Sequence, residues 1–336
     1  MMSTDSIQNK KGPKDSSIQS IHKAGQASGL GTWPGAGMGL SIGSNSRSGL
    51  LGPTRRQALG LVGYTLLGGS SIAQTAIKTS FDGLHCAEVM LNVDGYSVPV
   101  YTSAPIDSLG QVPKGLPVML VISEIFGVHE YIADVTRRFA KAGYFAIAPE
   151  LFIRQGDPQA YSDMQSLMKE VVSKVPDAQV MHDLDACVDW AGAQGADTKR
   201  LGINGFCWGG RVSWLYAETN PQVKAAVAWY GRVSGEHNQL QPFHPIERVM
   251  QLKAPVLGLY GELDTSISKA GVDEMLNALT NAGERGVSAA RKSKIKFYPN
   301  VGHAFHADYR ASYNQAAAED GWNLALNWFA QNGLRR

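Results

Sequence analysis

Cysteine is scarce in this sequence, and the common metal and phosphate motifs are missing. The 336 residues include three cysteines, and no two of them form a C-x-x-C pair. This count excludes a disulfide framework and the usual zinc and redox spacings. The sequence also has no H-E-x-x-H motif and no glycine-rich phosphate loop, so nothing in it is typical of a metalloprotease or a nucleotide-binding protein. We therefore expect no metal and no organic cofactor.

An excess of charge of one sign is also lacking. The formal net charge is +2, and residues 1–73 account for it with seven Lys or Arg against two Asp, which leaves the remainder mildly acidic. A basic stripe of the kind that binds nucleic acid is not predicted. With 44% apolar residues, the chain is long enough for one large α/β domain and too short for two.

The first part of the chain does not read as part of that domain. Residues 1–50 are rich in Ser, Gly, Asn and Lys, which predicts disorder. Arg55 and Arg56 then precede an uncharged stretch, residues 58–73, that is weakly apolar and ends in small residues. Paired arginines before such a run resemble a twin-arginine export signal. Ala58 departs from that pattern, because the motif usually has a large apolar residue there.

The signal has consequences for localisation and for the domain boundary. It predicts export by the twin-arginine machinery and a periplasmic or exported protein, with cleavage after Ala73 as one possibility. The alternative is a chance arginine pair before an ordinary helix, in a cytoplasmic protein. Translation from Met38 would explain the unusual length of the leader. We treat residues 1–73 as a disordered leader and residues 74–336 as a single domain.

From residue 81 onward, strand patterns alternate with helix patterns. Asp94-Gly95 between two alternating runs predicts a β-hairpin. Apolar runs of strand length occupy residues 117–123, 144–149, 201–206, 225–230, 256–260 and 295–298, and helical patterns occupy residues 134–143, 161–172, 178–193, 272–282 and 316–330. This alternation predicts an α/β fold, with a mostly parallel central sheet flanked by helices on both faces. In such sheets, chemistry takes place at the carboxyl ends of the strands.

Cys207 stands at the end of one of these strands, between Gly205 and the pair Gly209-Gly210. A strand that turns sharply into a helix through small residues is the pattern of a nucleophile elbow. The amino end of a helix favours a thiolate, which is the reactive form of cysteine. The alternative is a small buried side chain, as most free cysteines are. Cys187 falls on the apolar face of a helix and fits that alternative, and Cys86 receives no role.

A cysteine nucleophile needs a base, and the base needs a group that orients it. Asp264 and His303 follow two later strands in the chain order nucleophile, acid, histidine. Glu262 competes with Asp264 as the acid, and His306 competes with His303 as the base. The chemistry predicted is acyl transfer, with the thiolate attacking an ester or lactone carbonyl. The backbone N–H of Trp208 would donate to the oxyanion, and a second donor would come from the loop after residues 117–123.

Taken together, these residues resemble the dienelactone hydrolase family of the α/β-hydrolase superfamily. The resemblance extends over residues 91–334. Its most specific parts are SEIFGVHEYIADVTRRFAKAGYFAIAPELF (residues 123–152), GFCWGG (205–210), Asp264 after GEL, and YPNVGHAF (298–305). It implies an α/β-hydrolase fold and a carboxymethylenebutenolidase-type enzyme, a hydrolase of small esters or lactones with a Cys-His-Asp triad.

The resemblance also implies roles for two residues after the strand at 117–123. The acidic residue of the E-I-F-G motif, here Glu124, lies close to the resting cysteine in the family, and substrate displaces it as the thiolate forms. The N–H of Ile125 completes the oxyanion hole. From the residues alone, Glu124 is a strand-end carboxylate that is either solvated or in a salt bridge.

The sequence departs from the founding members in its arginines. Those members bind a substrate carboxylate with arginines, one of them a few residues after the catalytic histidine. Here the first arginine after His303 is Arg310. Arg232, two residues after Tyr230, is a candidate replacement, and a surface arginine is the alternative. Tyr230 and Arg232 are therefore candidate substrate-binding residues, and dienelactone itself is not predicted as the substrate.

Two other functions stay open. An α/β-hydrolase scaffold without activity could serve as a binding protein, although the complete set of Cys207, Asp264 and His303 argues against it. An amidase or peptidase on the same fold is the other alternative, and the short loops argue against large peptides. A small-molecule ester or lactone is the expected substrate.

Overall fold

The computed structural model describes residues 76–335. The predicted disordered leader, the twin-arginine signal at Arg55 and Arg56, and the alternative start at Met38 lie outside the described residues. Within residues 76–335, none of the helices has the length and apolar character needed to cross a membrane.

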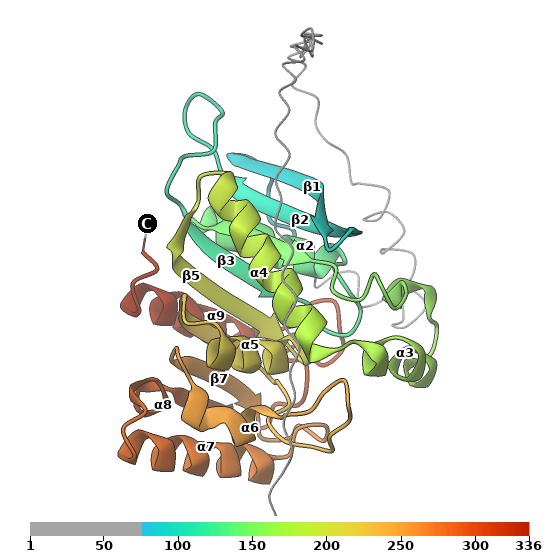
Figure 1. Ribbon diagram of the computed structural model, residues 1–336, viewed down its shortest axis with the longest axis vertical. Coiled ribbons are helices and arrows are strands. Elements are labelled where there is room, and N and C mark those ends of the chain that lie inside the picture. Colours follow the sequence, from blue (N-terminus) through green and yellow to red (C-terminus); the bar gives the residue numbers. More distant parts are fainter. Residues whose placement is uncertain (1–75, 336) are drawn as a thin grey trace, which may run out of the picture. The chain divides into compact units, whose positions relative to one another are not determined.

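An eight-stranded sheet forms the centre of the described part, in the order β1-β2-β4-β3-β5-β6-β7-β8 (Figure 1). β1 and β2 run antiparallel to each other and β2 runs antiparallel to β4, whereas all other neighbours are parallel. The strands are β1 (Leu84–Val93), β2 (Tyr96–Pro105), β3 (Pro117–Ile122), β4 (Phe145–Pro149), β5 (Asp197–Phe206), β6 (Val223–Trp229), β7 (Val256–Gly261) and β8 (Lys294–Tyr298). The predicted α/β fold with a mostly parallel sheet is confirmed.

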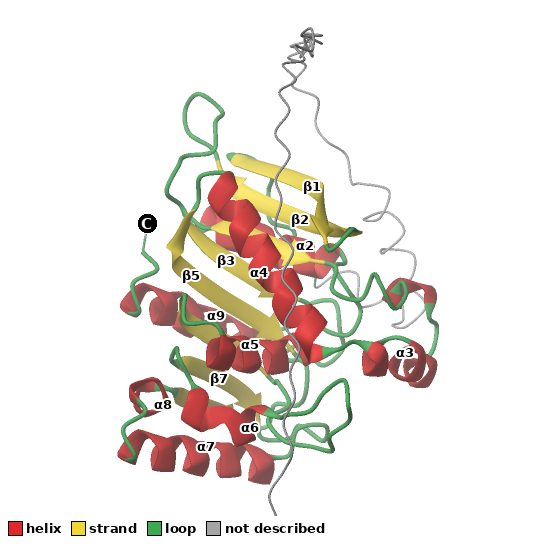
Figure 2. Cartoon of the chain, in the orientation of Figure 1, coloured by secondary structure: helices red, strands yellow, loops and turns green. Residues whose placement is uncertain are grey.

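Helices cover both faces of this sheet (Figures 1 and 2). The helices are α2 (Glu130–Lys141), α3 (Met164–Glu170), α4 (Asp177–Ala193), α5 (Trp208–Thr219), α6 (Pro245–Arg248), α7 (Lys269–Glu284), α8 (Ser288–Lys292) and α9 (Gln315–Gln331), with single 3-10 turns η2 (Pro158–Ala160), η3 (Val172–Lys174) and η4 (Val249–Gln251). Residues of α2 and α9 pack in one hydrophobic cluster, and residues of α4, α5, α7 and α8 pack in the other.

Alternation along the strands explains the two clusters. In β3, Val118, Leu120 and Ile122 belong to the cluster with α4 and α5, whereas Met119 and Val121 belong to the cluster with α2 and α9. Successive side chains of a strand point to opposite faces. A strand buried on both faces must be apolar at every position, which is the reason for the unbroken apolar run in the sequence.

The predicted hairpin is present between β1 and β2. Asp94 and Gly95 both have positive φ, at 52° and 80°, as the two central residues of a type I′ turn require. Asn92 supports the turn by accepting a hydrogen bond of 2.9 Å from the N–H of Gly95. The predicted hairpin is therefore confirmed, and β1 lies at one edge of the sheet.

Among the predicted helices, α2 differs most from its prediction at its start. α2 begins at Glu130, four residues before the predicted start at Asp134. Glu130 lies in the first turn, where a negative charge is favourable at the helix N-terminus, and the next two residues, Tyr131 and Ile132, are buried. The buried residues Tyr131, Ile132 and Val135 lie at helical spacing. The predicted start at Asp134 left the first two of them out of the helix.

The carboxyl ends of five strands meet at one edge of the sheet. Ile122 of β3 pairs with Gly205 of β5, Phe206 pairs with Trp229 of β6, and Gly261 of β7 pairs with Tyr298 of β8. The loops that follow these strands therefore emerge side by side. These loops and the start of α5 carry the residues that the sequence predicted for the site, namely Glu124, Ile125, Cys207, Trp208, Tyr230, Arg232, Asp264 and His303.

Candidate active site

Cys207 lies at the turn between β5 and α5 with φ 54° and ψ −111°. This is an unfavourable conformation for a residue with a side chain, with a cost of about 1–3 kcal/mol. Backbone hydrogen bonds hold it in place, because its N–H donates to Trp229 O at 2.9 Å and its carbonyl accepts from Gly210 N at 3.0 Å and Arg211 N at 3.2 Å. The strained turn of a nucleophile elbow is therefore present.

The glycines around Cys207 are explained by close backbone contacts. A Cβ atom at Gly205 would lie 2.0 Å from Gly209 O, one at Gly209 would lie 2.5 Å from Ile122 O, and one at Gly210 would lie 2.7 Å from Trp229 O. All three contacts are to backbone atoms, which have little freedom to move away. The G-x-C-x-G-G pattern is thus set by the packing of α5 against β3 and β6.

His303 and Asp264 form the predicted pair. Nδ1 of His303 lies 2.6 Å from Oδ2 of Asp264. The other carboxylate oxygen accepts hydrogen bonds from Ser266 N at 2.8 Å and Ile267 N at 2.9 Å, and the Asp264 side chain is fully buried. The buried carboxylate therefore fixes the orientation of the ring and leaves Nε2 as the nitrogen available to the thiol.

The charge state of His303 follows from its neighbours. Burial lowers the pKa of His303, but hydrogen bonds with Asp264 and with Cys207, together with the negative charges of the two groups, raise it to about 10. At neutral pH the imidazole therefore carries a proton and faces the thiol as a cation.

The two competing residues have other contacts. Glu262 is exposed, and no hydrogen bond or ion pair connects its side chain to His303. His306 is buried, and its Nδ1 lies 2.6 Å from the hydroxyl of Tyr131. Burial holds the pKa of His306 well below its ordinary value, and the positive charge of Arg138 lowers it further. This imidazole is therefore neutral. His306 is part of the core beneath the site.

Glu124 occupies a position level with Cys207. It is the second residue after Ile122, and Cys207 is the second residue after Gly205, the register partner of Ile122. The residue is 1% exposed. Its Oε2 accepts a hydrogen bond of 2.7 Å from the hydroxyl of Tyr309. The family resemblance places a glutamate close to the resting cysteine, and this register is consistent with that expectation.

The loop between β8 and α9 brings a tyrosine and an arginine to this edge. Tyr309 contacts Glu124, and the guanidinium of Arg310 lies 5.7 Å from the ring centroid of Phe126. Burial lowers the pKa of Arg310, but the negative charge of Glu124 and, to a smaller extent, that of Cys207 raise it overall. Sequence reasoning named Arg310 as the first arginine after His303 and did not place it at the site. Its position on the loop that carries His303 was the available signal.

Tyr230 and Arg232 lie in different surroundings. Tyr230 is fully buried, has φ 39°, and its ring meets the ring of His303 edge-on at 5.0 Å between centroids. Arg232 is exposed and lines a pocket of about 210 Å³ next to Ser266 and Ser268. A substrate-binding role for either residue remains a prediction.

The sequence predicts the backbone N–H groups of Trp208 and Ile125 as donors to an oxyanion. Trp208 is the first residue of α5, and the N–H groups in the first turn of a helix have no partner within the helix. Ile125 follows Glu124 in the loop after β3 and is buried. Their roles as oxyanion donors also remain predictions.

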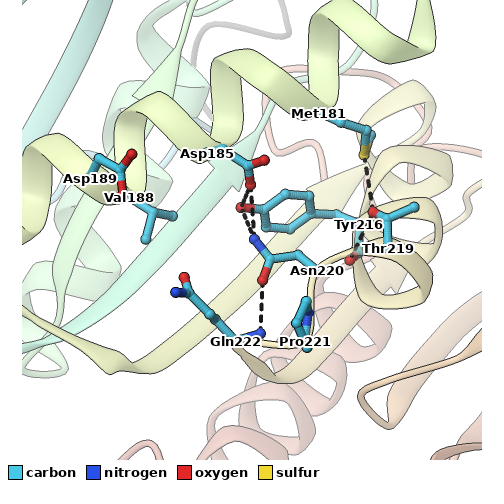
Figure 3. A pocket seen from close by; sticks show the side chains of 9 residues that line it. All are labelled: Met181, Asp185, Val188, Asp189, Tyr216, Thr219, Asn220, Pro221 and Gln222. Carbon is cyan, nitrogen blue, oxygen red and sulfur yellow. Dashed lines mark hydrogen bonds between the residues drawn. The ribbon is translucent and has the colours of Figure 1, made fainter.

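A separate cavity of about 400 Å³ lies between α4 and α5 (Figure 3). Its lining residues are Met181, Asp185, Val188, Asp189, Tyr216, Thr219, Asn220, Pro221 and Gln222. None of the predicted site residues is among them. Within residues 76–335, no group of three or more His, Cys, Asp or Glu side chains is arranged to hold a metal ion.

The parallel sheet covered on both faces, with a strained cysteine elbow and a His-Asp pair at the carboxyl ends of its strands, defines an α/β-hydrolase fold. A family model described as "Dienelactone hydrolase family" matches residues 106–333. The chain belongs to the dienelactone hydrolase family, and it is a hydrolase of carboxymethylenebutenolidase-like type.

Relatives with closely similar sequences support this assignment. A protein of Methylorubrum extorquens named "Putative carboxymethylenebutenolidase" is 50% identical over 273 residues, which cover 81% of this chain and 90% of the relative. A protein of Escherichia coli K12 with the same name is 47% identical over 267 residues, covering 80% and 94%. The crystal structure of a "Putative Dienelactone Hydrolase" from Klebsiella pneumoniae is 49% identical and has a TM-score of 0.69, covering 74% of this chain and all of that chain.

Proposed function

We propose that this protein hydrolyses a small ester or lactone through a covalent intermediate on Cys207. The observation that carries the proposal is the placement of one strained cysteine at the end of β5, beside an imidazole that Asp264 orients at 2.6 Å. The hydrogen bond and the charge of Cys207 are among the causes that raise the pKa of His303. The two groups are therefore close enough to exchange a proton.

The proposed acylation step begins with the Cys207 thiolate. Its sulfur forms a bond to the carbonyl carbon, and the electron pair of the C=O double bond moves to the oxygen. The backbone N–H groups of Trp208 and Ile125 donate hydrogen bonds to this oxyanion. When the intermediate collapses, the bond to the leaving oxygen breaks, and that oxygen takes the proton from His303. The product is an alcohol and a thioester on Cys207.

In the proposed deacylation, water attacks the thioester carbon while neutral His303 accepts its proton. Collapse of the second tetrahedral intermediate releases the carboxylic acid and restores the thiolate, and His303 is again a cation beside it. Asp264 keeps the tautomer and the orientation of the ring throughout. Glu124 takes the role that the family suggests, lying near Cys207 in the resting enzyme until substrate displaces it.

The charges at the site favour one class of substrate. Arg310 is partly buried, and the negative charges of Glu124 and Cys207 act on its guanidinium. A partly buried guanidinium at this edge would stabilise a carboxylate of the substrate when Glu124 moves away. We therefore propose that esters or lactones with an anionic group are preferred over neutral ones. An Arg310→Gln variant should lose this preference, measured as the ratio of kcat/KM for a charged and a neutral ester of the same leaving group.

The test of the mechanism compares the wild type with Cys207→Ala, Cys207→Ser and His303→Ala on a panel of one ester, one lactone and one amide. Cys207→Ala should reduce kcat by about 10³-fold or more on every compound that the wild type cleaves. Hydrolysis that is unchanged in Cys207→Ala would rule out the covalent mechanism. Turnover of the amide at a rate comparable with the ester would instead support the amidase alternative.

From the sequence, we also propose that the protein is exported in folded form through the twin-arginine machinery and acts in the periplasm. Folding before export would shield Cys207 from oxidants until the elbow is complete. Replacing Arg55 and Arg56 by Lys should retain the protein in the cytoplasm, as measured by cell fractionation. Mass spectrometry of the periplasmic protein that finds Cys207 in a disulfide would contradict the shielding argument.

A further inference from the structure

The residue that follows β4 has no role in the mechanism above. Glu150 is 5% exposed, and its Oε2 accepts a hydrogen bond of 2.8 Å from the backbone N–H of Val128. Val128 belongs to the loop between β3 and α2, residues 123–129. A carboxylate that solvent barely reaches depends on donors of this kind. The hydrogen bond therefore ties the end of β4 to the β3–α2 loop.

The same carboxylate explains a glycine in this loop. Gly127 has φ 73°, in the left-handed region that favours glycine. A Cβ atom there would lie 2.5 Å from Oε1 and 2.9 Å from Oε2 of Glu150. The carbonyl of Gly127 accepts a hydrogen bond of 3.1 Å from His129 N, which closes the turn before α2. The Glu150 side chain therefore packs directly against a turn whose shape depends on glycine.

Glu150 stands on a rigid support. All five residues of β4 are buried, and β4 pairs in parallel with β3. The backbone N–H of Glu150 donates a hydrogen bond of 2.9 Å to Pro99 O of β2, the neighbour of β4 on its other side. Side chains carried on strands of the scaffold are positioned more precisely than side chains on loops. The carboxylate is therefore a fixed point against which the β3–α2 loop rests.

The other end of the β3–α2 loop rests against the elbow. A Cβ atom at Gly209 would lie 2.6 Å from Ser123 O, so this carbonyl is in close contact with the start of α5. The loop is therefore fixed at Ser123 and again at Gly127, and Ile125 lies midway between them in the sequence. The N–H of Ile125 is the predicted second donor to the oxyanion. Such a donor is effective only within about 3.1 Å of the position that the oxyanion takes.

We propose that Glu150 is a positioning residue that aims the N–H of Ile125 at the oxyanion by holding Gly127 and Val128 in place. Glu150 acts through the β3–α2 loop and not on the reacting atoms. The role requires the reach of the side chain to the N–H of Val128. An amide of the same length keeps an acceptor oxygen at that distance, whereas a shorter carboxylate does not reach it. The proposal rests on the proposed function, because it assumes a tetrahedral intermediate on Cys207.

The test measures kcat/KM for p-nitrophenyl acetate and for the thionoester in which sulfur replaces its carbonyl oxygen. Sulfur is a weak hydrogen-bond acceptor, so the ratio of the two values reports on the oxyanion donors separately from the nucleophile and the base. The proteins compared are the wild type, Glu150→Gln, Glu150→Asp and Glu150→Ala. Asp157→Ala is the matched control, because Asp157 also follows β4, is exposed, and accepts a backbone hydrogen bond of 2.9 Å from Gln159 in its own turn.

Glu150→Asp and Glu150→Ala should lower the ratio of oxygen ester to thionoester by about 10-fold or more, because a donor displaced by a fraction of an ångström loses much of its effect. Glu150→Gln should keep the ratio within about threefold of the wild type, since a hydrogen bond to a neutral acceptor is weaker but has the same geometry. Asp157→Ala should match the wild type. An unchanged ratio in Glu150→Asp, or equal losses in Glu150→Asp and Glu150→Gln, would overturn the proposal.

If Glu150→Ala does not fold, Glu150→Asp and Glu150→Gln decide the question, with the stability of each measured by denaturant unfolding. A loss of stability with an unchanged ratio would mean that Glu150 only supports the fold, and it would overturn the proposal. A ratio near one in the wild type would also overturn it, because no oxyanion donor would then need positioning. Failure of the proposed function is distinguishable, since it would appear as full hydrolysis of the oxygen ester by Cys207→Ala.

Discussion

The candidate active site, at the carboxyl ends of β3, β5, β6, β7 and β8, and the cavity between α4 and α5 are built in different ways. In the cavity, the polar side chains satisfy one another: Asp185 accepts hydrogen bonds from Tyr216 at 2.7 Å and Asn220 at 2.8 Å (Figure 3). None of the residues that line the cavity has a positive φ. The backbone there is relaxed, and no nucleophile stands beside a base.

At the candidate active site, backbone strain and incomplete hydrogen bonding occur together. Cys207, Tyr230 and Ala304 have positive φ, and Ser123 Oγ and Glu124 Oε1 are buried without a hydrogen-bond partner among the described residues. Strained residues and unsatisfied buried polar groups are costly, and they concentrate where function requires them. The comparison teaches that the costly conformations, and not the cavity between α4 and α5, lie where the predicted site residues are.

The largest effect on activity is expected when the group that orients the base is removed. Asp264→Asn should reduce kcat by roughly 10³-fold or more, because the amide fixes the wrong tautomer of His303. The matched control is Glu262→Gln, since Glu262 is the neighbouring exposed carboxylate. Steady-state kinetics on an ester that the wild type cleaves provide the measurement. Equal losses in the two variants would mean that the geometry of the pair does not matter.

The packing at the elbow can be tested through its glycines. Gly209→Ala should destabilise the protein by about 1–3 kcal/mol or more, because its Cβ would lie 2.5 Å from Ile122 O. Gly192→Ala, on the helix that lines the cavity, is the control, and its nearest contact would be the methyl group of Thr198 at 3.2 Å. Denaturant unfolding measures both changes. A Gly209→Ala variant as stable as Gly192→Ala would show that the elbow is not tightly packed.

The ion pair at the site predicts a pH dependence of stability. The pKa of His303 is raised to about 10 in the folded protein, above the value of about 6.5 expected in the unfolded chain. The folded state then binds more protons between these values, so stability falls as pH rises. The extra free energy of unfolding of the wild type over His303→Gln should be full below about pH 6.5 and lost as pH passes 10. Asp264→Asn should weaken this dependence, and an unchanged dependence would contradict the assigned cause.

The smallest effect is expected in the cavity. Asp185→Asn removes a charge from an exposed position and keeps an oxygen that can accept from Tyr216, so we expect a stability change within about 1 kcal/mol and unchanged kcat/KM. A large loss of activity in this variant would mean that the cavity is coupled to the candidate active site. In that case the contrast between the two regions would need revision.

Much of the fold could be predicted from local pattern. The strands of the core are read from unbroken apolar runs, because burial on both faces leaves no position for polar residues. Cys207 is recognised in the sequence by the glycines around it. Close backbone contacts leave no room for a side chain at Gly205 or Gly209, so glycine is required at both positions. Asp264 and His303 are placed by their position directly after strands, since parallel strands end at one edge.

The rest depends on contacts that no local pattern encodes. The contact between Tyr309 and Glu124 spans 185 positions, and nothing in the residues around Tyr309 indicates its partner. The same holds for His306, whose contact with Tyr131 spans 175 positions. The early start of α2 at Glu130 was also missed, because burial of Tyr131 and Ile132 depends on the sheet beneath them. Propensity is a weak guide where tertiary packing decides.

The most direct test of the central claim is to trap the acyl group on Cys207. The protein is mixed with p-nitrophenyl acetate, quenched in acid during the first turnovers, and digested for mass spectrometry. We predict that one acetyl group is found on the peptide that contains Cys207, and that Cys207→Ala shows neither the adduct nor turnover. Steady turnover with no acetyl group on that peptide, and with full activity in Cys207→Ala, would contradict the account.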